Sequence, residues 1–221
     1  MRMSGVDEGT SWDLDKEHRE ACDVSPKAIA QNHSTIERLR AYRQAADTAT
    51  KALIPFKEVQ AVAVFGSVVL PLWKEDPRSE IDRRIGIEPW HEDPRIDLAV
   101  WLDRFNQLSA MRVAINRALM LNRDPGTKVE MSEIAVNLLE HGTDRHVGNL
   151  CEFKACPANK PACQVPGCGA VGHLRQFRDY RFDHNVLEPD RSVRLFDRAT
   201  NRFERASRLP EPEGIDASIA E

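Results

Sequence analysis

The chain has 221 residues, of which 41% are apolar and 30% are charged, an ordinary composition for one folded domain with an appendage. Its 31 Lys and Arg residues against 35 Asp and Glu residues leave a net charge of -4, which argues against a general attraction to nucleic acid or to an anionic membrane. No segment approaches the roughly 18 consecutive apolar residues that span a bilayer, and residues 1–16 lack the apolar centre of a signal peptide, so we expect a cytoplasmic protein.

The first predicted elements are a polar lead and a helix. Residues 1–33 are polar and weakly patterned, and we expect a loose lead with at most one short helix. Ser34 and Glu37 then form a capping-box pattern, and apolar side chains follow at helical spacing as far as Ala49. These signals predict a helix over residues 35–53, with Pro55 just beyond its end.

The next segment predicts a strand, a turn and a loop. Residues 59–65 (VQAVAVF) are apolar and rich in β-branched side chains, which is typical of a buried strand. Gly66 and Ser67 predict a turn, and VVLPLW after them predicts the start of a short helix. Residues 73–95 are charged and rich in proline, so we expect an inserted surface loop there.

The chain then repeats this alternation. Residues 96–102 (IDLAVWL) predict a second strand, residues 106–121 an amphipathic helix, and residues 134–139 (IAVNLL) a third strand. The order of helices and strands predicts a mixed α/β sheet flanked by helices over residues 34–145.

The composition changes in residues 146–221, where we expect a small zinc-binding segment followed by a tail. VRLFDRATNRFERA, from Val193 to Ala206, predicts either a hairpin that turns at Thr200 and Asn201 or a helix. The last dozen residues contain two prolines and a glycine and predict a loose tail.

Two short sequences carry the candidate chemistry. A strand that ends in Gly66-Ser67 lets a ligand approach the backbone closely, and a phosphate group suits such a corner. Asp97 is a carboxylate in an otherwise apolar strand, which is costly unless it is hydrogen-bonded, binds metal or lies at the end of the sheet. Mg²⁺ is commonly held by one or two carboxylates together with substrate phosphates. The residues alone favour an Asp97 that begins the strand and accepts backbone hydrogen bonds, with a Mg²⁺–nucleotide site as the other reading.

In this order, VFGSVVLPL and RIDLAVWL resemble the nucleotidyltransferase superfamily, which has a polymerase-β-like fold. The resemblance covers residues 35–140. In that family a strand, a Gly-Ser turn and a helix precede a strand with the motif Asp-x-Asp, and a later strand supplies a third carboxylate. Gly66 and Ser67 match the turn, and Asp97 matches the second aspartate. The resemblance implies transfer of a nucleoside monophosphate from a nucleoside triphosphate to an acceptor, with Gly66 and Ser67 holding the triphosphate and Asp97 acting as a catalytic ligand of Mg²⁺.

The carboxylate set departs from the family pattern. Arg95 stands where the family has its first aspartate, and a guanidinium there repels Mg²⁺ but could itself contact a triphosphate. Glu92 or Asp93 could replace the missing carboxylate from the preceding loop. For the third carboxylate the sequence offers Glu133, as a base or second metal ligand, or Glu130 further upstream. The alternative function is therefore a catalytically inactive relative that binds nucleotides or protein partners.

Four of the five cysteines fall within 18 residues, among prolines and glycines: Cys151, Cys156, Cys163 and Cys168. Four thiolates in a compact loop suit a tetrahedral structural zinc ion, and in a reducing cytoplasm clustered cysteines hold metal more often than they form disulfides. His173 or His184 could replace one cysteine as a ligand. Free thiols, disulfides and buried apolar cysteines are the competing interpretations. A zinc module that binds RNA is a further reading, which the acidic net charge disfavours.

Overall fold

The structure is a computed structural model that describes residues 12–69, 95–121, 128–154, 156, 171–176 and 180–211. Of residues 12–29, 31 and 32 it describes the helical backbone only. The chain divides into two compact units, one of residues 1–36 and 73–91 and the other of residues 37–72 and 92–221. Apart from the first part of helix α1, the features described below belong to the second unit. The predicted loop at 73–95 lies outside the described residues, except for Arg95.

Helix α1 spans Trp12–Leu53 and begins well before the predicted residue 35. Residues 12–33, expected as a loose lead with at most a short helix, are helical instead. Alanine, glutamate, lysine and arginine, which favour a helix, are frequent there, although Pro26 interrupts them. Within the described part of the chain, no helix combines the length and the apolar character that a membrane span requires.

The C-terminal part of α1 packs on the sheet through mostly small side chains. Its buried positions recur every three or four residues, as expected for one face of an amphipathic helix. They are Ala41, Tyr42, Ala45, Ala46, Ala49 and Leu53. Alanine at four of these positions allows the helix to lie close to the strands.

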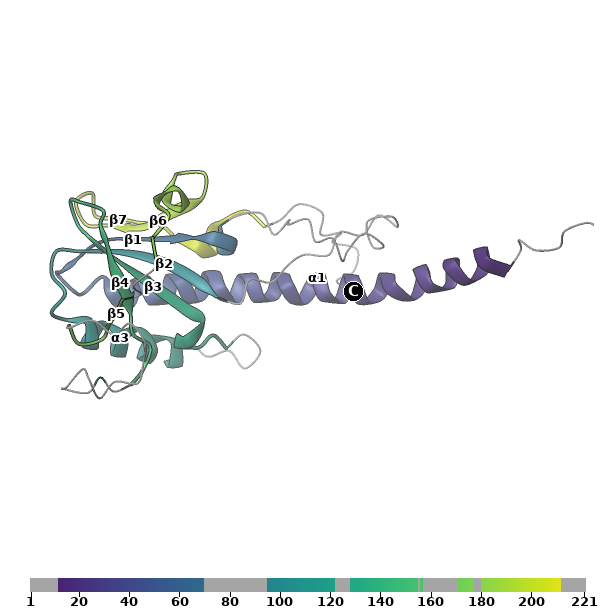
Figure 1. The fold of residues 1–221 in the computed structure, drawn as a ribbon, viewed down its shortest axis with the longest axis horizontal. Coiled ribbons are helices and arrows are strands. Elements are labelled where there is room, and N and C mark those ends of the chain that lie inside the picture. Colours follow the sequence, from purple (N-terminus) through teal and green to yellow (C-terminus); the bar gives the residue numbers. More distant parts are fainter. Residues whose placement is uncertain are drawn as a thin grey trace, which may run out of the picture. The chain divides into compact units, whose positions relative to one another are not determined.

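Seven strands form one mixed sheet in the order β5-β4-β3-β2-β1-β6-β7 (Figure 1). Their bounds are Val59–Phe65 (β1), Ile96–Leu102 (β2), Ile134–Glu140 (β3), His146–Leu150 (β4), Leu174–Arg175 (β5), Ser192–Asp197 (β6) and Arg202–Phe203 (β7). The pair β2–β3 is parallel, and every other neighbouring pair is antiparallel. Helix α3, Leu108–Leu121, connects the two parallel strands. The predicted mixed α/β class is confirmed.

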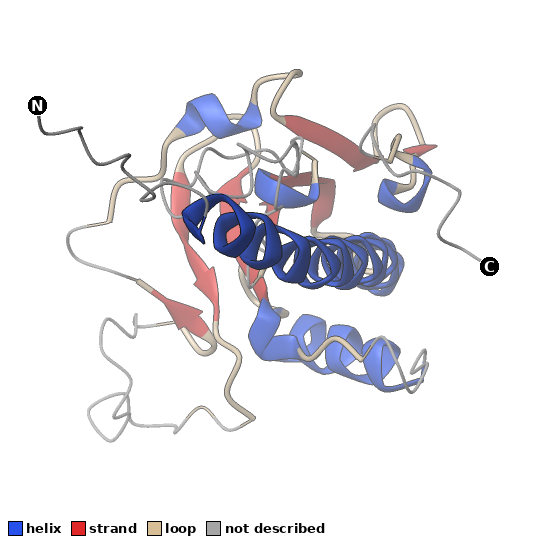
Figure 2. Cartoon of the chain, turned by 90° about the vertical axis from the view of Figure 1, so that its right-hand side faces the viewer, coloured by secondary structure: helices blue, strands red, loops and turns tan. Residues whose placement is uncertain are grey.

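The two faces of the sheet are covered differently. Side chains of α1 and α3 join those of the strands in one large apolar cluster, so both helices lie on the same side of the sheet (Figure 2). On the opposite side, residues of β1, β2 and β3 form a smaller cluster: Ala61, Ala63, Phe65, Ala99, Trp101 and Leu139. Phe182, Val186 and Leu187 pack on it from a segment with the 3-10 turn η5, His184–Leu187. Within the described residues no α-helix packs there, and we call this side the helix-free face.

Strands from the last third of the chain belong to the same sheet. β4 pairs with β3, and β6 pairs with β1. The predicted boundary at residue 146 therefore does not coincide with a boundary of the sheet. The hairpin predicted around Thr200 and Asn201 is confirmed by β6 and β7, and Asn201 takes the positive φ of 50° that such a turn requires. The backbone N–H and the hydroxyl of Thr200 donate to Asp197, which lowers the pKa of that carboxyl.

Arg43 on α1 is a buried side chain that binds three backbone carbonyl groups. Its Nε donates to the carbonyl of Val68 at 3.1 Å, and its Nη1 donates to those of Leu209 and Pro210 at 2.9 and 3.0 Å. Burial lowers the pKa of this guanidinium from its ordinary value, but an arginine remains charged at neutral pH. One charged side chain therefore joins α1, the turn after β1 and the C-terminal segment.

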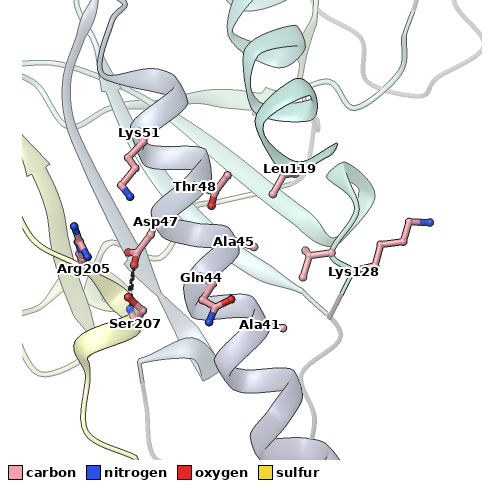
Figure 3. Close-up of a pocket in the computed structure, with 11 residues that line it drawn as sticks. Ala41, Gln44, Ala45, Asp47, Thr48, Lys51, Leu119, Lys128, Arg205 and Ser207 are labelled. Atoms are coloured by element: carbon pink, nitrogen blue, oxygen red, sulfur yellow. Dashed lines mark hydrogen bonds between the residues drawn. The ribbon is translucent and has the colours of Figure 1, made fainter. Parts of the chain in front are cut away.

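Asp47 lies one turn further along α1 and binds the same C-terminal segment (Figure 3). Its Oδ1 accepts a hydrogen bond from the backbone N–H of Ala206 at 2.7 Å. Its Oδ2 accepts from the N–H and the hydroxyl of Ser207 at 3.3 and 2.6 Å. These bonds provide acceptors for the first N–H groups of the 3-10 turn η6, Ala206–Arg208.

Arg198, directly after β6, holds the connection between α1 and β1. Its Nη2 donates to the carbonyls of Ile54 and Phe56 at 2.9 and 2.8 Å, and its Nε donates to that of Val59 at 2.6 Å. The end of α1 and the start of β1 are thus fixed by a side chain from the last third of the sequence.

Replacing Arg43 by Met is expected to lower the free energy of unfolding by about 3 kcal/mol, because three carbonyl groups lose a charged donor inside the protein. Arg40→Met is the matched control. Arg40 is on the same helix and pairs with Glu211 at 2.7 Å, but its side chain is 53% exposed, so we expect a loss below about 1 kcal/mol. Urea unfolding followed by circular dichroism measures both, and equal losses would contradict the role assigned to Arg43.

Candidate functional site

The Gly-Ser turn lies at the end of β1 and has a defined geometry. Gly66 has a φ of +79°, a backbone conformation that residues other than glycine rarely adopt. Gly66–Val68 form the 3-10 turn η1, and the N–H of Val69 donates to the carbonyl of Gly66 at 3.0 Å. Because Arg43 binds the carbonyl of Val68 from α1, the turn is also held from the helix side. The half-buried Ser67 has no hydrogen-bond partner within the described part of the chain.

Asp97 lies beside this turn. The antiparallel register of β1 and β2 pairs Phe65 with Asp97, so the next residue, Gly66, is adjacent to the carboxylate. A Cβ atom placed on Gly66 would lie 3.6 Å from Oδ2 of Asp97. Ile96 and Leu98 point into the apolar cluster under the helices, which places Asp97 on the helix-free face. The structure therefore brings together Gly66 and Asp97, which the sequence places 31 positions apart.

Arg95 contacts the same carboxylate. Its Nε lies 3.3 Å from Oδ1 of Asp97 and 3.4 Å from Oδ2. The Arg95 side chain is 60% exposed, whereas that of Asp97 is only 13% exposed. The guanidinium can therefore turn away into solvent, while the carboxylate stays at the start of β2. A cation at Asp97 has to displace this arginine, whereas an anion such as a phosphate can use it.

Glu133 and Glu130 have other partners. Glu133 accepts hydrogen bonds from Arg38 and Tyr42 of α1, and its Oε2 accepts the backbone N–H of Glu130 at 2.7 Å. The bond from Glu130, together with one from the backbone N–H of Glu133 to the Glu130 side chain, forms the capping box of the 3-10 turn η3, Met131–Glu133. The position on β3 in register with Asp97 is Ala135. Glu133 is thus engaged by α1 and Glu130 by Lys128, and the structure does not join them to Asp97 and Gly66.

Two asparagines on the helix-free face are not predicted from the sequence. Asn137 is in register with Ala99 and is buried; its Nδ2 donates to the carbonyl of Leu98 at 3.3 Å. Asn149 of β4 donates to Oδ1 of Asn137 at 3.0 Å. An amide within the apolar run IAVNLL is the only sequence signal for this polar pair. Asn137 lies two residues beyond Ala135, the register partner of Asp97, and its amide is bound to Leu98 and Asn149.

Aromatic rings extend from the turn across the helix-free face. The ring of Phe65 meets that of Phe182 edge-on, with centroids 5.9 Å apart. His146 stacks on Phe182 at 5.0 Å, and Tyr180 meets His146 at 5.4 Å. Burial lowers the pKa of His146, and the nearby His184 lowers it further. Burial also raises the pKa of Tyr180, and the charge of Asp97 adds to this effect.

The described part of the cysteine cluster consists of Cys151 and Cys156, while Cys163 and Cys168 lie outside the described residues. Cys151 is buried, and its N–H donates to the carbonyl of His173 at 2.8 Å. The N–H of His173 donates to the Sγ of Cys156 at 3.4 Å, and the His173 side chain is itself buried. His184, the other histidine considered as a ligand, contacts Phe182 instead. Among the described residues, no group of three His, Cys, Asp or Glu side chains could hold a metal ion.

A hollow of about 250 Å³ lies along α1 (Figure 3). Its walls come from α1, the end of α3, residues 128–129 and the C-terminal segment with Arg205 and Ser207. The carboxylate of Asp47 in this hollow is bound to Ser207. None of the residues predicted for the site lines the hollow, which lies on the side of the sheet covered by the helices.

Comparison with known proteins adds no assignment. No family model matches the chain, and no curated protein matches its sequence. The proposed function therefore depends on the arrangement of Gly66, Ser67, Arg95 and Asp97.

The lowered pKa of His146 predicts a pH-dependent stability. Below about pH 6.5 the unfolded chain takes up a proton on this histidine before the folded chain does. The stability present above that pH is therefore lost as the pH falls toward the folded pKa. His146→Phe keeps a ring against Phe182 and is expected to flatten this part of the dependence. Urea unfolding of both proteins at about pH 7.5 and about pH 5.5 measures it; parallel losses in the two proteins would contradict the prediction.

Proposed function

We propose that this protein is nucleotidyltransferase-like and binds a nucleoside triphosphate together with Mg²⁺ where β1 ends beside Asp97. The triphosphate lies against Gly66 and Ser67, and Asp97 supplies a carboxylate to the metal. The activity proposed from the family resemblance is transfer of a nucleoside monophosphate to an acceptor group, with release of pyrophosphate. The observation that carries the proposal is the 3.6 Å distance between the Cβ position of Gly66 and the Asp97 carboxylate.

Three features support the proposal. β1, the Gly-Ser turn and β2 follow each other in the order of the resembled family, and the two strands are direct neighbours in the sheet. The absence of a side chain at Gly66 allows a ligand to approach the backbone next to Asp97. Asp97 also faces the side of the sheet that the described α-helices do not cover, and its side chain remains 13% exposed.

The described residues fit one Mg²⁺ ion that arrives with the nucleotide. Magnesium is often bound by one or two carboxylates together with phosphate oxygens and water, and Asp97 meets that minimum. A pair of metal ions needs further carboxylates. Ala135 and Asn137, the nearest positions of β3 on this face, supply none, and Glu133 is bound to Arg38. Within the described residues the donor set is therefore too small for two metals.

A second function, nucleotide binding without transfer, is favoured by the contact of Arg95 with Asp97. The arginine neutralises the carboxylate when no metal is present, and it can contact a phosphate oxygen once Mg²⁺ has displaced it. The protein then still binds the nucleotide, although it lacks the carboxylates that a catalytic pair of metal ions needs. The two functions share the site and differ in turnover, so one experiment separates them.

Calorimetric titration with each nucleoside triphosphate is expected to show binding that requires both Mg²⁺ and Asp97. Asp97→Asn should weaken binding at least tenfold, roughly the effect of removing one charged metal ligand. Asp103→Asn is the matched control, because Asp103 follows β2 at its other end and bonds Gln60 and His141 instead. Absence of binding to the wild type at millimolar nucleotide would refute a nucleotide site.

Two further variants complete this test. Gly66→Ala and Gly142→Ala both place a side chain at positive φ, +79° and +87°, but only the first puts a methyl group beside Asp97. We expect the two variants to lose similar stability. Weaker nucleotide binding in Gly66→Ala alone would then support the site. Arg95→Asp restores the family's aspartate and should raise pyrophosphate release if transfer occurs. Unchanged release in a variant that still binds nucleotide favours binding without transfer.

We also propose a structural zinc ion held by the cysteine-rich segment, in a cytoplasmic protein whose thiols stay reduced. The support comes from the spacing of the four cysteines and from Cys156, whose sulfur accepts a backbone N–H. Hydrogen bonds to ligand atoms are a regular feature of the second shell of metal sites. The buried His173 side chain next to Cys156 is the alternative fourth ligand to Cys151, because its backbone already bridges both cysteines.

Metal analysis of the purified protein is expected to find about one zinc ion per chain, as in other four-ligand structural sites. Cys156→Ser should lose the metal and lower the midpoint of thermal unfolding. Cys22→Ser, which removes the cysteine outside the cluster, should keep both. A protein without zinc, in which every thiol titrates freely, would rule the site out.

A further inference from the structure

The aromatic rings on the helix-free face form a continuous path that starts at the phosphate-binding corner. Phe65 is the last residue before Gly66 and the register partner of Asp97. Its ring contacts Phe182, which stacks on His146, and His146 in turn contacts Tyr180. The path therefore leads from the proposed triphosphate site to Tyr180.

Tyr180 is the exposed member of this path. Its exposed fraction is 49%, whereas Phe65 is buried and His146 and Phe182 are half-buried. The ring meets the His146 imidazole at an interplanar angle of 65°. The Tyr180 ring is thus in contact with a ring on the sheet, and about half of the residue remains accessible.

Tyr180 also lies within electrostatic range of the proposed site. The carboxylate of Asp97 raises the pKa of the Tyr180 hydroxyl and the guanidinium of Arg95 lowers it, although burial contributes more than either charge. The same two side chains form the ion pair beside Gly66. The charges of this ion pair therefore act on the tyrosine hydroxyl.

A nucleotide bound through its phosphates at Gly66 and Asp97 has to place its base on a neighbouring surface. Bases stack on aromatic side chains, and such stacking tolerates any base because each has a π face. Tyrosine suits this task because it offers a large rigid ring at a low cost in conformational entropy. His146, which is neutral, and Phe182, which is apolar, support the ring. Neither carries a charge that would lose its water when a base binds.

We propose that Tyr180, supported by His146 and Phe182, forms the surface on which the base of the bound nucleotide stacks. This inference rests on the proposed nucleotide site and adds a base subsite to it. The ring supplies affinity for the base and the ribose end of the ligand, while Gly66 and Asp97 bind the phosphate end. Residues from the last third of the chain thereby complete a site whose phosphate end is built by β1 and β2.

The test compares ATP with inorganic tripolyphosphate, each with Mg²⁺, on the wild type, Tyr180→Ala and Tyr180→Phe. Tyr180→Ala should weaken ATP binding by about 5-fold to 100-fold, the range seen when stacking aromatic residues are truncated. Tripolyphosphate binding should stay unchanged, because this ligand has no base. Tyr180→Phe keeps the ring and should bind ATP like the wild type.

The outcomes separate the two proposals. If the wild type binds both ligands and Tyr180→Ala leaves ATP binding unchanged, the stacking role is refuted and the nucleotide site stands. If Tyr180→Ala weakens both ligands equally, the tyrosine acts on the phosphate end or on the fold, which also overturns the stacking role. If the wild type binds neither ligand, the nucleotide site itself is refuted, and the base subsite with it.

Discussion

The register between β1 and β2 decides which side chains face the helices and which face the candidate site. Phe65 pairs with Asp97, so Leu98 lies under the helices while Asp97 and Ala99 face the opposite side. A shift by one residue would exchange the two faces of β2 and bury the carboxylate among apolar side chains. An unpaired buried charge costs several kcal/mol. The apolar residues of β2 thus hold Asp97 beside Gly66, and the position of the carboxylate depends on core packing.

The strands around the site are predictable because their signal is local. Residues 59–65 and 96–102 are apolar runs of strand length, and both observed strands have these bounds. Such runs require burial on both faces, which only the centre of a sheet provides. Gly66 and Asp97 stand out in the sequence because the glycine ends the first apolar run and the carboxylate interrupts the second. Their closeness depends only on the pairing of two neighbouring strands.

The rest of the site depends on contacts that no local pattern shows. The place of Glu133 just before β3 predicts that it supplies the third carboxylate of the site. Its partner is Arg38, however, which lies 95 positions earlier on α1. The amide pair of Asn137 and Asn149 requires knowledge that β4 lies beside β3. β5 has only two residues, too few for any periodicity. The charges of Arg95 and Asp97 act on Tyr180, and no local pattern shows that residues 182–187 pack on the same face of the sheet.

The position of β6 next to β1 limits how this protein can be divided. A fragment that ends at residue 145 would contain the whole Gly66–Asp97 corner but would leave β1 without its neighbour β6. β1 would then be an exposed apolar edge, the kind of strand that pairs with other chains and aggregates. Arg43 would also lose two of its three carbonyl acceptors. The residues around Gly66 and Asp97 are therefore not an independent folding unit. Mutations that loosen residues 192–210 would also disturb this corner, because β1 depends on β6 for its pairing.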